Sequence, residues 1–95
     1  MEENIFKLSL DKWGEEAQYN QMVEECAELI VAINKYKRFL DGEKKQTKEE
    51  VMFNLFEEIA DVKICIQQLE YILGTEKIDE VYKLKMQKFL NQINS

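Results

Sequence analysis

The chain has 95 residues, of which 45% are hydrophobic and 34% are charged, and its formal net charge is −6. This length and composition predict one folded helical domain over residues 1–95 and exclude a disordered chain. The negative charge argues against a nucleic-acid polymer as partner. The absence of histidine excludes a histidine-based triad, the usual zinc sites and the Glu-x-x-His motif of ferritin-like di-iron bundles.

The first half of the chain predicts a short N-terminal element and two long helices. Residues 1–12 are expected to form either a short helix or an extended arm that packs on the body. A long helix is predicted from about Glu15 to Phe39, and a polar loop follows it. Thr47 and Glu50 have the spacing of a capping box, so a second long helix is predicted from there to about Leu73.

Gly74 is predicted to end the second long helix, and Thr75 to cap a third helix over residues 76–93. The apolar side chains of this third helix recur at helical spacing: Ile78, Tyr82, Met86, Phe89 and Ile93. Together these elements predict an all-α fold of three to four helices. Because so short a chain buries a limited core alone, we expect an antiparallel helical bundle that is completed by oligomerisation, as a homodimer or homotetramer.

Two ten-residue segments of the chain are nearly duplicated. The segment Glu24–Ile33 is echoed 33 residues later by the segment Glu57–Ile66. Each begins with two glutamates, has a third acid three residues after the second glutamate, and then turns apolar. A single copy of this pattern is most simply the solvated face of an amphipathic helix. Two matching copies favour a shared function for the acids.

On a helical wheel, each duplicated segment has an apolar stripe with an acidic stripe beside it. The apolar stripes are Met22, Cys26, Leu29 and Ile33, and Leu55, Ile59, Val62 and Ile66. The acidic stripes are Gln21, Glu25, Glu28, Ala32 and Lys35, and Asn54, Glu58, Asp61, Cys65 and Gln68. If the apolar stripes pack antiparallel, as a short connection favours, the acidic stripes are expected to face each other across a groove.

The acidic stripes are candidates for a metal site. Glu25 with Glu28, and Glu58 with Asp61, each place two carboxylates on one face of a helix. All four ligands are hard oxygen donors, which favours Mg²⁺, or alternatively Mn²⁺, over zinc or copper. Because magnesium also binds substrate phosphates, a nucleoside polyphosphate is the expected substrate.

The spacing Glu25-x-x-Glu28 followed by Glu58-x-x-Asp61 on successive helices resembles the MazG-like all-α nucleoside triphosphate pyrophosphohydrolase superfamily. The flanking segments are also similar: Trp13–Gln18, Val23–Leu29, Asn34–Arg38 and Glu57–Val62. The resemblance covers about residues 11–73, and the C-terminal helix carries no matching motif. The 29 residues between the two acidic pairs are more than is usual in this family, and they include a charged loop.

The resemblance implies hydrolysis of a nucleoside triphosphate between its α and β phosphates, giving a monophosphate and pyrophosphate. It also implies that the four carboxylates hold Mg²⁺, which neutralises phosphate charge and lowers the pKa of a bound water. Glu24 and Glu57 lie at the outer margins of the acidic stripes. Either is a candidate to orient or deprotonate that water, and the alternative role is a salt bridge to a lysine.

Five further residues are candidates for substrate binding. Trp13 is expected either to stack on a base or to pack the N-terminal arm onto the bundle. Gln18 and Gln21 lie on the acidic face, as contacts to base or sugar or as ordinary surface glutamines. Lys35 is the strongest candidate for a phosphate contact. Arg38 is expected either to hold a phosphate or to interact with the helix dipole.

An alternative function is a non-enzymatic helical dimerisation or regulatory module with the same fold, whose acids face solvent or bind a metal for structure only. Cys26 and Cys65 are predicted to be buried, reduced thiols, as in a cytoplasmic protein. No charged-then-apolar signal opens the chain, and no segment approaches the roughly 18 apolar residues of a membrane span. We therefore expect no membrane partner.

Overall fold

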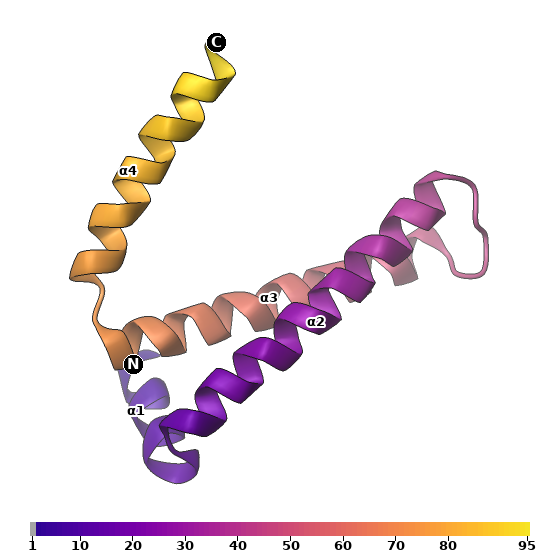
Figure 1. The fold of residues 1–95 in the computed structure, drawn as a ribbon. Coiled ribbons are helices and arrows are strands. Elements are labelled where there is room, and N and C mark those ends of the chain that lie inside the picture. Colours follow the sequence, from indigo (N-terminus) through magenta and orange to yellow (C-terminus); the bar gives the residue numbers. More distant parts are fainter. Residues whose placement is uncertain (1) are drawn as a thin grey trace.

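The computed structural model describes the backbone of residues 2–95 and the side chains of residues 5–95. Residues 2–95 contain four helices and no strand: α1 (Glu2–Trp13), α2 (Glu15–Leu40), α3 (Lys48–Leu73) and α4 (Glu76–Ile93). Figure 1 shows that α2 and α3 form a long antiparallel hairpin, with α1 near its open end and α4 projecting away. The predicted all-α fold is confirmed, and the N-terminal element is a helix.

A sharp turn at Gly14 joins α1 to α2. The backbone of Gly14 has φ of 89°, a conformation that favours glycine because side chains with a Cβ are strained there. Two buried glutamines then attach α1 to the hairpin. Gln18 exchanges hydrogen bonds with Ser9 at 3.3 and 3.4 Å, and Gln68 Nε2 donates to the carbonyl of Phe6 at 3.1 Å. The interpretation of Gln18 as a surface glutamine is therefore wrong, because α1 covers it.

The start of α3 is fixed by the predicted capping box. The backbone N–H of Glu50 donates to Thr47 Oγ1 at 3.2 Å, and the backbone N–H of Thr47 donates to Glu50 Oε1 at 2.9 Å. These reciprocal bonds satisfy two amides that have no partner within the helix. Helix α3 therefore begins directly after the loop of residues 41–47 and runs antiparallel to α2 (Figure 1).

The connection between α3 and α4 differs in part from the prediction. Gly74 ends α3 as expected, with φ of 84° and its N–H donating to the carbonyl of Glu70 at 2.8 Å. Thr75 occupies the N-cap position of α4, but its side chain makes no capping hydrogen bond. Its backbone already has helical angles, φ −97° and ψ −20°, which are unlike the extended backbone that a capping threonine usually adopts.

The contact between α2 and α3 runs between the apolar and the polar stripes. Among the side chains of residues 5–95, the buried ones are Gln18, Ala32, Val51, Cys65 and Gln68. Most of these lie on or beside the acidic stripes. The apolar stripes are only partly covered, since Ile33 and Ile59 are 41% and 43% exposed. Five other members of the apolar stripes are half-buried: Met22, Cys26, Leu29, Leu55 and Val62. The expected packing of one apolar stripe on the other therefore holds only in part, because the most deeply buried side chains lie at the edge of the polar stripes.

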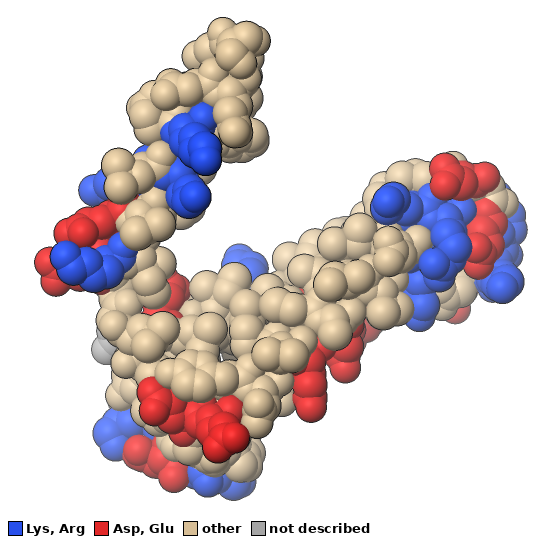
Figure 2. Space-filling model, viewed as in Figure 1, with Lys and Arg blue, Asp and Glu red and all other residues tan. Residues whose placement is uncertain are grey.

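The hairpin consequently has two different faces. On the wheel of each helix, the apolar stripe lies on one side of the contact and the acidic carboxylates lie on the other. Figure 2 shows a continuous uncharged surface along α2 and α3, with acidic side chains emerging at its edge. Lysine and arginine gather at the loop end of the hairpin in the same view. No helix within residues 2–95 is both long and apolar enough to span a bilayer.

Candidate metal centre

Four carboxylates meet midway along the hairpin. Glu25 and Glu28 come from α2, and Glu58 and Asp61 come from α3. Each offers one oxygen, and these four oxygens all lie within 4.8 Å of one another. The spacing of three residues puts each pair on one face of its helix, and the antiparallel pairing brings the two faces together. The prediction that the acids of the two duplicated segments lie close together is thus confirmed.

Two oxygens in this cluster lack a hydrogen-bond partner. Oε2 of Glu25 and Oε2 of Glu58 are shielded from solvent, and within residues 5–95 neither accepts a hydrogen bond. The other oxygen of Glu25 accepts a hydrogen bond from Gln21 Nε2 at 2.7 Å. A shielded carboxylate oxygen without a donor is energetically unfavourable. A bound cation would satisfy both of these oxygens, so the donor set fits a hard divalent ion.

The negative charges of the cluster are also unfavourable for one another. Burial, followed by the negative charges of Glu28 and Asp61, raises the pKa of Glu25 and the pKa of Glu58. In the described side chains no lysine or arginine forms an ion pair with any of the four carboxylates. Burial, and then the charge of Glu25, also raises the pKa of the neighbouring Cys65 thiol. The side chains that converge here are carboxylates, the ligand type that hard divalent ions such as Mg²⁺ and Mn²⁺ prefer.

A groove of about 290 Å³ adjoins the carboxylates on the side of the loop. Its lining comes from both helices: Ala27, Glu28, Val31, Lys35, Asn54 and Glu58. Lys35, the predicted phosphate contact, therefore shares a groove with two of the candidate metal ligands. It lies seven residues beyond Glu28, which is about 10 Å along a helix. That distance suits an anion that extends from the carboxylates toward the loop.

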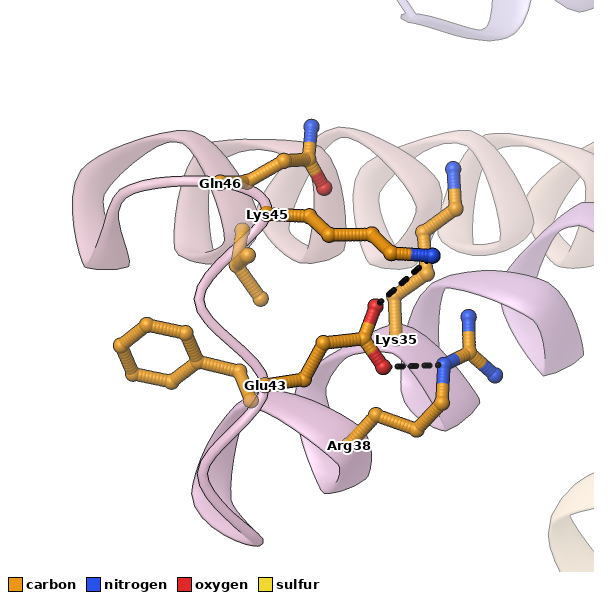
Figure 3. A pocket seen from close by; sticks show the side chains of 7 residues that line it. Lys35, Arg38, Glu43, Lys45 and Gln46 are labelled. Carbon is orange, nitrogen blue, oxygen red and sulfur yellow. Dashed lines mark ion pairs between the residues drawn. The ribbon is translucent and has the colours of Figure 1, made fainter.

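Figure 3 shows a second pocket, of about 320 Å³, at the loop end of the hairpin. Lys35, Arg38 and Lys45 line it together with Gln46. Glu43 lies between two of these cations, with one oxygen 3.3 Å from Arg38 Nε and the other 3.9 Å from Lys45 Nζ. The pocket therefore holds one carboxylate among three basic side chains, an arrangement that also suits a phosphate group.

The opposite end of the hairpin has an apolar cleft of about 410 Å³. The cleft is lined by Ser9, Trp13, Ala17, Gln18, Gln21, Ile64, Cys65 and Gln68. Trp13 is 62% exposed, which is unlike a residue that packs the N-terminal helix onto the bundle. Gln21 connects this cleft to the carboxylates through its hydrogen bond to Glu25. The cleft is thus the place where an aromatic base could reach the tryptophan ring.

The two candidate water-orienting residues lie apart from the cluster. Glu24 and Glu57 are exposed, and neither belongs to the group of converging carboxylates. Each directly precedes a member of that group in the chain. Glu57 contributes to the electrostatics of the site, because its charge is one of the smaller causes of the raised pKa of Glu58.

Two residues near the site carry roles that the sequence did not indicate. Glu43 bridges Arg38 and Lys45, although it belongs to a loop of alternating charges that is typical of a solvated segment. Gln68 is only 5% exposed and is one of the residues that line the apolar cleft. Gln68 shares a face of the helical wheel with Asp61 and Cys65, and this was the sequence signal that it lies near the site. Its burial is explained only by the position of α1.

The fold and the site define an all-α protein with a carboxylate centre between two antiparallel helices. Comparisons of the chain with protein families, with curated proteins and with solved structures found no match in any of the three.

Proposed function

We propose that this protein is a MazG-like, Mg²⁺-dependent pyrophosphohydrolase that cleaves a (deoxy)nucleoside triphosphate to a monophosphate and pyrophosphate. The observation that carries the proposal is the set of four carboxylate oxygens, from the two duplicated segments, within 4.8 Å of one another. Among the side chains of residues 5–95 no lysine or arginine pairs with these acids to offset their mutual repulsion. A bound Mg²⁺ would supply that positive charge and would also bind the phosphates of the substrate.

Glu25, Glu28, Glu58 and Asp61 would hold Mg²⁺, or alternatively Mn²⁺. Bound there, the ion would supply charge neutralisation on the phosphates and a water of lowered pKa. Gln21 orients Glu25 by donating to one of its oxygens, which leaves the other oxygen for the ion. Glu24 or Glu57 would orient the attacking water, since each directly precedes a candidate ligand in the chain and is exposed.

The substrate would lie along the hairpin. Its base would enter the apolar cleft beside Trp13 and Gln21, and Gln18 would hold the cleft's shape through its bonds to Ser9. The phosphates would extend past the carboxylates toward Lys35 and then Arg38. Base and phosphate sites thus lie at opposite ends, with the scissile bond at the metal centre between them.

The proposal includes a cytoplasmic homodimer or homotetramer with no membrane partner. Two results test it: heat released on titration with Mg²⁺ or Mn²⁺, and pyrophosphate release from a panel of canonical and modified triphosphates. The double substitution Glu28→Gln with Asp61→Asn should abolish both while circular dichroism shows retained helix. Glu49→Gln, which changes an exposed acid at the start of α3, is the matched control and should change neither.

A non-enzymatic dimerisation or regulatory module is the second candidate. It is favoured by the exposed apolar side chains of α4 and of the α2–α3 hairpin, which suit association with another protein. Binding of the divalent ion without pyrophosphate release from any nucleotide would select this function. Failure to bind any divalent ion would remove the hydrolase proposal altogether.

A further inference from the structure

Helix α4 carries an apolar stripe that stays exposed in the described part of the chain, residues 5–95. Its side chains lie within an 80° arc of the helical wheel: Ile78, Tyr82, Met86, Phe89 and Ile93. They are between 38% and 63% exposed, and every residue of α4 is exposed. Helices α1, α2 and α3 contact one another, whereas α4 projects from the end of α3 into solvent (Figure 1).

A second uncovered apolar surface lies on the hairpin. We call it the hairpin face, and it comprises Val23, Ile30 and Ile33 of α2 and Phe56, Ile59 and Ile66 of α3. These side chains are between 41% and 69% exposed. On the helical wheels they lie on the opposite side of the α2–α3 contact from the carboxylates. Covering this face would therefore leave the metal centre open.

The chain exposes much more surface than a compact monomer of its mass. Its accessible area is 7715 Å², whereas a folded monomer of 11.4 kDa exposes about 5,800 Å². Its radius of gyration is 16.9 Å, against about 12.4 Å for a compact chain of this length. The excess area is about 1,900 Å² per chain, and a stable dimer of standard size buries only about 800 Å² on each partner.

The stripe of α4 is longer than the hairpin face. From Ile78 to Ile93 the stripe extends about 22 Å along the helix. The hairpin face extends about 15 Å, from Val23 to Ile33 on α2 and from Phe56 to Ile66 on α3. One α4 is therefore long enough to cover the hairpin face from end to end.

We propose that α4 docks on the hairpin face of a second copy of this chain, and that the second copy returns the same contact. Such an exchange is an isologous interface, in which each copy contributes both an arm, which is its α4, and a face, which is its hairpin face. The turn at Gly74 supports the exchange. With φ of 84° and its N–H bonded to Glu70, this residue directs α4 away from the hairpin of its own chain.

One substitution on each surface tests the exchange. Phe89→Asp alters the arm, Ile33→Asp alters the face, and Leu84→Asp is the matched control because Leu84 is 72% exposed on the opposite side of α4. The wild type and the control should form dimers in sedimentation analysis at micromolar concentration. Each of the other two variants should dissociate about 100-fold more readily, as expected when a charge enters an apolar contact. Circular dichroism should show unchanged helix content.

Mixing the two variants identifies the pairing. The Ile33→Asp copy has an intact arm and the Phe89→Asp copy has an intact face, so the mixture should recover dimers that neither variant forms alone. A monomeric wild type would overturn the proposal, because α4 would then be free or folded onto its own hairpin. Dimers that survive either single substitution would also overturn it, since they would show pairing of arm with arm or of face with face.

The exchange of α4 and the proposed hydrolase activity are tested by separate results. The hairpin face and the carboxylate cluster lie on opposite sides of the α2–α3 contact. A monomeric wild type that still releases pyrophosphate would overturn the exchange and the proposed assembly but not the hydrolase activity, and a dimer that binds no divalent ion would overturn the activity alone.

Discussion

The Glu25→Gln substitution should stabilise the metal-free protein. It removes one negative charge from the cluster but keeps a carbonyl oxygen that can accept the hydrogen bond from Gln21. One oxygen of Glu25 lies within 4.8 Å of an oxygen of each of the other three carboxylates. In water two unit charges at that distance repel by about 0.9 kcal/mol, and physiological salt about halves this value. Loss of three such repulsions should therefore raise the free energy of unfolding by about 1.3 kcal/mol.

The assay is thermal unfolding followed by circular dichroism, with EDTA and with saturating Mg²⁺. In EDTA the variant should unfold roughly 5 to 10 °C above the wild type. Mg²⁺ should raise the Tm of the wild type more than that of the variant, because the ion binds the folded state and the variant has lost a ligand. Protein concentration must be equal throughout, since association also shifts the Tm.

Glu24→Gln is the matched control for this prediction. Glu24 precedes Glu25 on the same helix, is exposed and lies outside the cluster. Its removal should change stability by no more than about 0.5 kcal/mol. The reasoning would be refuted if E25Q were less stable than the wild type in EDTA, or if Mg²⁺ shifted both proteins equally.

Four further predictions follow from the structure. In the folded protein the pKa values of Glu25 and Glu58 are raised above 4.5. Their contribution to the free energy of unfolding of the metal-free protein should therefore be complete below about pH 4.5, and it should be lost as the pH rises through the raised values. Urea unfolding with EDTA should show this decline, and Mg²⁺ should reduce it. Lys35→Ala should raise the KM for triphosphate about tenfold, with a smaller change in kcat, in a pyrophosphate-release assay. Thr47→Ala should cost about 1 kcal/mol in thermal unfolding, with or without Mg²⁺, because it removes the capping box. Glu43→Gln should tighten the binding of inorganic pyrophosphate several-fold in calorimetry, and unchanged affinity would show that this carboxylate does not compete for the basic pocket.

Local signals in the sequence predict most of the fold. Thr47 and Glu50 are three residues apart, and they suffice to place the start of α3 because both capping bonds are local. Gly14 and Gly74 mark helix boundaries because their backbones need positive φ. The carboxylate cluster is also predictable, since a repeat at 33 residues with a short connection aligns the two acidic pairs.

Tertiary contacts account for what the sequence did not predict. Gln18 and Gln68 are buried because α1 lies against the hairpin, and no local pattern records that position. Ala32 and Cys65 are buried in the contact of α2 and α3, where their small side chains let the two helices approach at the edge of the polar stripes. The wheel separates the two stripes correctly, but it does not say which stripe faces the neighbouring helix.

The position of the carboxylates beside the helix contact links metal binding to folding. Repulsion among the four acids opposes the pairing of α2 with α3, and few buried apolar side chains offset it in one copy of the chain. A cation on one side of the contact and an apolar partner on the other would both stabilise the same antiparallel pair. If α2 and α3 are not fully paired in the free chain, binding of the cation favours the paired state, and so does binding of the apolar partner. Thermodynamic linkage then requires the cation and the partner each to strengthen the binding of the other. A single hairpin can thus couple assembly to metal affinity without any contact between the two sites.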